Sequence, residues 1–165
     1  MLVILLRHGE AVEAETMGET AVLGDSGRAL TGKGRKQTRR VSEWLVLRAK
    51  TPKTKKERPG IIWTSPLVRA VQTAEIAAGF LELSDEVIVR PELMPGADVR
   101  DLLAALSSYR SPKPLMLVGH EPGLSLLAAR LLGQRKFSGF KKSGLAAISI
   151  TDHLPGKVVF SRGLK

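Results

Sequence analysis

Near the start of the chain, a run of five aliphatic residues, 2–6, ends directly in Arg7, His8 and Gly9. A short, uninterrupted aliphatic run is typical of a strand that is buried on both faces of a sheet. Charged and imidazole groups at the end of such a strand are costly unless they have a partner or a ligand. Arg7 and His8 are therefore candidates for a binding or catalytic role.

Strand patterns alternate with helix patterns along the chain. We predict strands at residues 2–6, 61–64, 87–89, 115–118, 145–150 and 157–161. We predict helices that end near residues 49, 78, 106 and 132, the first three capped by Thr31, Ser65 and Asp98 and the last starting at Pro122. The alternation predicts a single domain, residues 1–165, with a three-layer α/β/α sandwich and a mostly parallel central sheet. Residues 10–27 are predicted to be a loop, and residues 51–60 an exposed, mobile basic connector.

The loops after three predicted strands carry polar residues that should meet. In an open parallel sheet, ligands bind beyond the carboxyl ends of the strands. His8 follows the first strand, Ser65 and Arg69 follow the second, and His120 follows residues 115–118. A guanidinium and the first turn of a helix both favour phosphate, and a neutral imidazole is a nucleophile for phosphorus. This edge of the sheet is therefore predicted to be an anion pocket that contains two imidazoles.

Composition narrows the class of protein. The 165 residues are 43% hydrophobic and include no cysteine, which favours one soluble domain and excludes disulfide scaffolds and thiolate metal sites. The aliphatic runs are too short to span a bilayer, and residues 2–6 lack the features of a signal peptide, so we expect a cytoplasmic protein without membrane partners. The net charge of +10 favours anionic partners. The third histidine, His153, is interpreted as a surface turn residue.

A basic chain can also be a nucleic-acid-binding module, and this stays open as an alternative. Aromatic residues make up only 4% of the chain and are not interleaved with the basic clusters, so specific nucleic-acid binding is not expected. A metal hydrolase is a further alternative, but no HExxH or similar spacing supports it. We therefore expect neither a metal nor another cofactor.

Three motifs, in this order, resemble those of the histidine phosphatase superfamily, which includes the cofactor-dependent phosphoglycerate mutases. They are Arg7-His8-Gly9, the sequence SPLVRAVQTA at residues 65–74 and the sequence VGHEP at residues 118–122. The pattern D-x-x-R-x-L-T-x-x-G-x-x-Q at residues 25–37 is similar to that of the short branch, the SixA-type phosphohistidine phosphatases. The resemblance covers residues 2–132 and implies a phosphoglycerate mutase-like fold.

The resemblance also implies roles for the residues of the predicted pocket. His8 would be the nucleophile that becomes phosphohistidine. Arg7, Arg69 and His120 would hold the phosphoryl oxygens.

Other site residues are implied more weakly. The proton donor of the family lies in the loop after the third strand, where Glu92 stands in a Glu-x-x-x-Gly pattern. Asp98 is the competing candidate, although a helix cap explains it well. Asp25 and Arg28 match family positions, or they simply pair with each other and order the loop. Ser65 is a supporting candidate near the phosphate.

The expected substrate is phosphohistidine on a protein partner. An imidazole leaves phosphorus more easily than an alkoxide, so strong help from a general acid is less needed. Little sequence remains for a lid, and an open cationic site suits a phosphate displayed on a protein surface. A phosphatase for small phosphorylated molecules is the alternative, and a mutase, which needs a closed pocket, fits this short chain less well.

Overall fold

The computed structural model describes residues 1–13, 24–151 and 155–165. Most of the predicted loop at residues 10–27 and the predicted turn residue His153 lie outside these ranges. The strands are β1 (Leu2–Arg7), β2 (Ile61–Thr64), β3 (Val87–Val89), β4 (Leu115–Gly119), β5 (Phe140–Ser149) and β6 (Lys157–Leu164). The helices are α1 (Gly32–Arg48), α2 (Val68–Leu81), α3 (Val99–Ser107) and α4 (Gly123–Leu131), with short 3₁₀ turns η2 (Gly24–Gly27), η3 (Lys55–Glu57), η4 (Ser84–Glu86) and η5 (Pro91–Leu93).

The six strands form one sheet in the order β3-β2-β4-β1-β5-β6. β2 pairs in parallel with β3 and β4, and β4 pairs in parallel with β1. β5 runs antiparallel to both β1 and β6. The predicted mostly parallel sheet is confirmed. Because β5 is antiparallel, its amino end lies at the same edge as the carboxyl ends of β1, β2 and β4.

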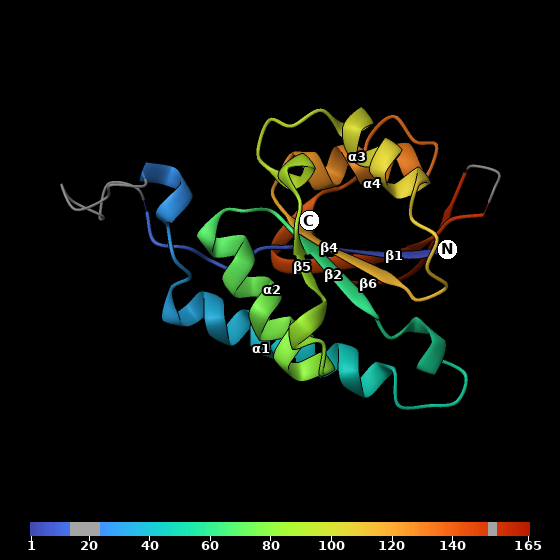
Figure 1. Cartoon of the computed structure of the whole chain (residues 1–165), viewed down its shortest axis with the longest axis horizontal. Helices are drawn as coiled ribbons and strands as arrows, with labels where there is room; N and C mark the ends of the chain where they lie inside the picture. The colour runs from blue at the N-terminus through green and yellow to red at the C-terminus, as the bar shows by residue number, and fades with distance from the viewer. Residues whose placement is uncertain (14–23, 152–154) are drawn as a thin grey trace.

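The helices cover both faces of the sheet, as the three-layer prediction requires. Figure 1 shows α1 and α2 on one side and α3 and α4 on the other. On the first side, Val41 and Leu45 of α1 and an alanine-rich face of α2 pack on Ile4 and Val118. The small alanine side chains let α2 approach the sheet closely, which brings its first turn to the carboxyl edge of β2.

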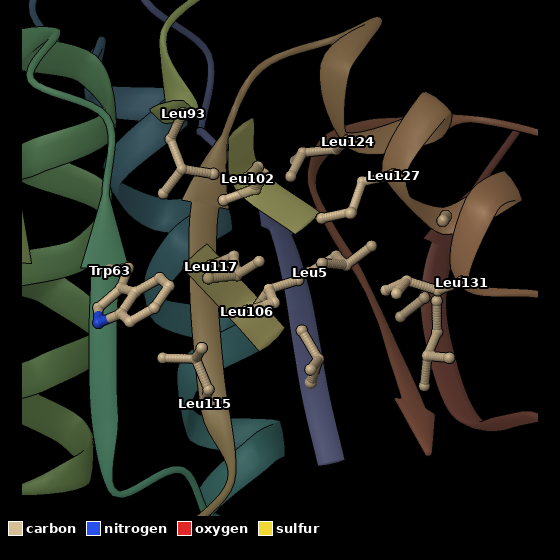
Figure 2. Close-up of a cluster of buried hydrophobic side chains, with 14 of the residues drawn as sticks. Leu5, Trp63, Leu93, Leu102, Leu106, Leu115, Leu117, Leu124, Leu127 and Leu131 are labelled. Carbon is tan, nitrogen blue, oxygen red and sulfur yellow. The ribbon is translucent and has the colours of Figure 1, made fainter. Parts of the chain in front are cut away.

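The other face buries a cluster of leucines. Figure 2 shows side chains from α3 and α4 packed over β1, β2 and β4. Burying one leucine side chain stabilises the fold by roughly 1.5–3 kcal/mol, so this cluster is a large part of the hydrophobic stabilisation. Its labelled members are Leu5, Trp63, Leu93, Leu102, Leu106, Leu115, Leu117, Leu124, Leu127 and Leu131.

Two of the three predicted helix caps are confirmed. The Thr31 hydroxyl accepts from the Gly34 N–H (3.0 Å), and the Asp98 carboxylate accepts from the Arg100 N–H (2.8 Å). The prediction for Ser65 was wrong, because α2 begins at Val68 and has no side-chain cap. The Ser65 hydroxyl is instead directed to a histidine of the carboxyl edge, described below.

The last two strands and the basic connector also differ from expectation. β5 begins at Phe140, five residues before the predicted start, and β6 continues to Leu164. Half of the residues in the connector at 51–60 are exposed, but it contains η3 and is tied to the body of the protein. Arg58 donates to the Leu81 carbonyl (2.6 Å), and Glu57 pairs with a helix α1 arginine (3.0 Å). Within the described ranges, no helix is long and apolar enough to cross a membrane.

Candidate active site

His8 follows β1, and its side chain is buried at the carboxyl edge of the sheet. Its ring Nδ1 lies 2.7 Å from the carbonyl oxygen of Gly9. Because a carbonyl oxygen only accepts, Nδ1 carries the proton and Nε2 keeps its lone pair. Burial, followed by the positive charge of Lys142, lowers the pKa of His8 to about 3, so the ring is neutral at pH 7.

His120 follows β4 and lies directly beside His8. The two ring centroids are 4.9 Å apart, and the ring planes make an angle of 50°. The His120 Nε2 lies 2.8 Å from the Ser65 hydroxyl, which fixes the orientation of the ring. Its Nδ1 is buried and has no hydrogen-bond partner among the described residues. Burial, followed by the charge of Arg69, lowers the pKa of His120 to about 4.

Two guanidinium groups lie at the same edge. Arg7 is the last residue of β1, and its Nη1 donates to the Phe140 carbonyl (2.7 Å). Arg69 is the second residue of α2 and is buried. The charges of both arginines lower the pKa of His120, so both act on the same ring. The structure thus brings Arg7, His8, Arg69 and His120 together.

Asp25, in the short turn η2, connects two arginines. The Arg69 Nη2 donates to Asp25 Oδ2 (2.9 Å), and the Arg28 Nη1 donates to Asp25 Oδ1 (2.9 Å). Hydrogen bonds from Arg28 and then from Arg69 hold the pKa of Asp25 below its usual value. Asp25 and Arg28 therefore pair with each other, as the simpler sequence interpretation proposed, and Asp25 also orients the Arg69 guanidinium.

The backbone that carries His8 is packed tightly between two helices. A Cβ atom on Gly9 would approach the Gly34 carbonyl oxygen to 2.8 Å, and a Cβ atom on Gly34 would clash with the backbone of Glu10. On the other side, the Gly9 N–H donates to the Thr73 hydroxyl of α2 (3.1 Å). Helices α1 and α2 therefore fix the backbone that carries His8.

Glu92 and Asp98 differ in their environment. Glu92 lines a small cavity together with His120, and its Oε2 is buried without a hydrogen-bond partner in the described part of the chain. Its Oε1 accepts from the Arg90 Nη2 (2.9 Å). The Asp98 carboxylate pairs with Arg100 (2.6 Å), which lowers the pKa of Asp98 to about 2. Asp98 is thus an ionised helix cap, and Glu92 is the acidic residue that shares a cavity with His120.

Two groups near the site were not expected from the sequence. Glu121 accepts from the Phe140 N–H (2.6 Å) and holds the start of β5 next to Arg7. Lys142 of β5 is half-buried and, among charged groups, depresses the pKa of His8 most strongly. The sequence signal for Lys142 was a pair of lysines two residues before the predicted strand 145–150, in a segment assumed to lie outside the sheet.

The carboxyl edge thus combines two neutral imidazoles with two guanidinium groups. The donors of a guanidinium group match the oxygens of a phosphoryl group in geometry. An imidazole with a free lone pair can attack phosphorus and so receive the phosphoryl group. In the residues that the structure describes, no group of three or more His, Asp or Glu side chains could hold a metal ion. The arrangement can therefore bind a tetrahedral oxyanion and accept a phosphoryl group on the Nε2 of His8.

Comparison with known proteins agrees with this geometry. Residues 3–94 match the family described as the histidine phosphatase superfamily (branch 1). The phosphohistidine phosphatase SixA of Escherichia coli (strain K12) is 29% identical over 154 residues, which cover 92% of this chain and 87% of that protein. An uncharacterized protein of Picosynechococcus sp. (strain ATCC 27264 / PCC 7002 / PR-6) is 33% identical, with 90% and 84% covered.

The fold is also shared with solved structures. A structure of the protein histidine phosphatase SixA complexed with tungstate superposes with a TM-score of 0.79 at 26% identity, covering 99% of this chain and 97% of that one. The predicted phosphoglycerate mutase-like fold and the similarity to SixA-type proteins are confirmed by these matches.

Proposed function

Because the chain belongs to the histidine phosphatase superfamily, we propose that it removes the phosphoryl group from phosphohistidine on a protein partner, through a covalent phosphohistidine at His8. The observation that carries this proposal is the His8 ring, which is neutral, has a free Nε2 and lies 4.9 Å from His120. Arg7 and Arg69 supply the positive charge that a phosphoryl group needs.

The reaction has two steps. In the first, the His8 Nε2 attacks phosphorus, an N–P bond forms, and the bond from phosphorus to the nitrogen of the substrate imidazole breaks. Before this bond breaks, the other ring nitrogen of the substrate imidazole takes up a proton from solvent, so the imidazole leaves neutral. In the second, a water oxygen attacks phosphorus, the bond to His8 breaks, and phosphate leaves. The water proton passes to Glu92 or to the departing phosphate, and Nε2 regains its lone pair.

Positive groups stabilise both steps. Charge builds on the three oxygens of the transferring phosphoryl group, and fixed donors around it lower the barrier. The Gly9 carbonyl keeps the proton of His8 on Nδ1, and Asp25 holds the guanidinium of Arg69. Removing one such donor costs about 10²–10³-fold in kcat, which is the loss we expect for Arg69→Ala.

A phosphohistidine substrate fits the acid–base groups of the site. Glu92 shares its cavity with His120 and with apolar side chains such as Leu93 and Leu124, so it is the candidate proton donor. An imidazole leaving group needs less help from this donor than an alkoxide does. The similarity to a protein named phosphohistidine phosphatase supports the same substrate class.

A protein partner fits the surroundings of the site. The connections from β2 to α2 and from β4 to α4 are three residues each, 65–67 and 120–122, so these two connections contribute no lid over the edge. The net charge of +10 favours a partner with an acidic surface. Both features suit a phosphoryl group that is presented by another protein.

The experiment is to incubate the full chain with a histidine-phosphorylated protein, with phosphoserine and with phosphoglycerate, and to follow phosphate release. We expect release from phosphohistidine to be fastest and an acid-labile phosphoryl group to be trapped on His8, located by mass spectrometry. His8→Ala should abolish both signals. Ser84→Ala, at an exposed residue of η4 before the amino end of β3, should leave them unchanged.

Two results would overturn the proposal. Faster release from phosphoserine or phosphoglycerate than from phosphohistidine would show a small-molecule phosphatase instead. A phosphoryl group trapped on a residue other than His8 would show that the nucleophile was misassigned.

A further inference from the structure

The start of β5 has an irregular backbone next to the candidate active site. Phe140 pairs with Leu164 and Leu145 pairs with Arg162, so residues 141–144 of β5 lie opposite the single residue Gly163. A Cβ atom on Gly144 would clash with the Gly163 backbone, so the two strands touch closely at this point. Such bulges redirect side chains and are frequent beside active sites.

This bulge is anchored to the residue that carries the nucleophile. The Ser143 N–H donates to the His8 carbonyl (3.2 Å), and its hydroxyl lies 3.1 Å from the Thr38 hydroxyl of α1. Ser143 has a φ of 54°, a left-handed conformation that non-glycine residues seldom adopt. A strained residue that is held by two elements of a site indicates a functional constraint on the backbone.

The bulge sets Lys142 among groups of the same charge. Its ammonium interacts with the positive charges of Arg7, Arg28 and Arg69, and burial is the main cause that lowers the pKa of Lys142. Glu10, two residues after His8, forms an ion pair with Lys33 (2.7 Å). In the described part of the chain Lys142 makes no ion pair or hydrogen bond, and the Glu13 carboxylate, which acts on it more weakly than the three arginines, offsets only part of this repulsion.

We infer that Lys142 is a further phosphoryl-binding residue, whose ammonium donates to an oxygen of the anion held by Arg7, Arg69 and His120. A half-buried cation beside other cations is unfavourable unless an anion joins them. Ser143, the next residue, donates to the His8 carbonyl (3.2 Å), which places the Lys142 backbone beside the segment that carries the nucleophile. The inference rests on the proposed function only in that the bound anion is taken to be a phosphoryl group.

The test compares Lys142→Met with Lys141→Met, the same substitution at the neighbouring lysine, which is exposed. Binding of tungstate and of inorganic phosphate to the full chain is measured by calorimetry. A hydrogen bond between charged groups accounts for about ten- to a hundredfold in affinity, and this is the loss expected for Lys142→Met. Lys142→Arg should recover most of the affinity, and Lys141→Met should stay within about twofold of the unchanged protein.

High salt separates a direct contact from general attraction. At about 1 M salt the screening length is only about 3 Å, so a loss for Lys142→Met that persists there supports a contact. Thermal unfolding of each variant shows that it is folded, and Lys142→Gln replaces Lys142→Met if the latter is not.

The inference is overturned if Lys142→Met binds tungstate as tightly as the unchanged protein, or if Lys141→Met loses as much affinity. The outcome is independent of the proposed substrate. A chain that binds tungstate through Lys142 but fails to hydrolyse phosphohistidine would contradict the proposed function alone. A chain that hydrolyses phosphohistidine but binds tungstate equally well without Lys142 would contradict this inference alone.

Discussion

The rings of His8 and His120 lie 4.9 Å apart, and burial keeps both of them neutral at pH 7. Their neutrality has two consequences. The lone pair of the His8 Nε2 is available to phosphorus, and the two adjacent imidazoles do not repel each other. The positive charge for binding an anion must therefore come from the neighbouring arginines and, by our inference, from Lys142.

The same neutrality predicts how stability depends on pH. In the unfolded chain both imidazoles take up protons near pH 6.5, whereas in the folded protein they stay neutral down to about 4 for His120 and about 3 for His8. The unfolded state then binds more protons, so the free energy of unfolding should fall as pH decreases from 6.5 to 4. Thermal unfolding between pH 7.5 and 4 measures this decline.

A variant isolates the contribution of one imidazole to this decline. Carboxylates with lowered pKa values, such as Asp25, also lose stabilisation in acid. These groups are unchanged in His8→Gln, so its decline between pH 6.5 and 4 should be shallower than that of the unchanged protein. Equal slopes would show that His8 is not buried in a neutral form.

Ser65→Ala should impair catalysis more than it impairs stability. The hydroxyl orients the His120 ring from 2.8 Å and does not cap α2. Loss of such a hydrogen bond is worth about 0.5–1.5 kcal/mol, which corresponds to a decrease in kcat of up to about tenfold. Steady-state kinetics measures the effect on kcat, and urea unfolding measures the effect on stability. A variant with an unchanged kcat and a lowered stability would favour the helix-cap interpretation instead.

Gly34→Ala and Gly79→Ala should have opposite effects on stability. Both glycines are in helices, where alanine is favoured by about 0.5–1 kcal/mol. A Cβ atom at Gly79 meets nothing within 4 Å, so Gly79→Ala should be stabilising by that amount. At Gly34 the Cβ atom would clash with the Glu10 backbone, and this overpacking should cost about 1–3 kcal/mol. Urea unfolding of both variants measures these effects. A stabilising Gly34→Ala would contradict the close packing of α1 on the backbone after His8.

Glu92→Gln should distinguish substrates by their leaving groups. Hydrolysis of an alkyl phosphate needs a proton donor and should fall by about 10²-fold or more. Hydrolysis of phosphohistidine should fall less, because imidazole leaves easily. Asp98→Asn, which changes the ionised cap of α3, should leave both rates unchanged. Equal losses on the two substrates in Glu92→Gln would contradict the leaving-group argument.

The meeting of His8, Arg69 and His120 was predictable because it depends on a general property of parallel sheets. Each residue follows a short, mainly apolar strand, and parallel strands end at one edge. Aliphatic runs such as residues 115–118 identify these strands well, since a strand buried on both faces has no polar positions.

The errors came from places where tertiary contacts override local patterns. Ser65-Pro66 has the sequence of a helix start, but the hydroxyl of Ser65 bonds to His120, which is distant in the sequence. The start of β5 was missed because Lys141 and Lys142 interrupt the apolar pattern and the bulge removes the alternation of a regular strand. Local sequence signals carry no information about either contact.

Because β5 is antiparallel, two separate stretches of sequence form the edge of the sheet that carries the site. His8 and the two arginines belong to segments that precede α4 in the sequence. The bulge belongs to the hairpin of β5 and β6, which follows α4. Side-chain substitutions in this hairpin that keep the hydrogen bonds of the Ser143 N–H and the Phe140 carbonyl can raise or lower the cationic character of the pocket while the reacting groups keep their positions. A protein engineer who wished to retune affinity for more or less highly charged phosphorylated molecules would begin there.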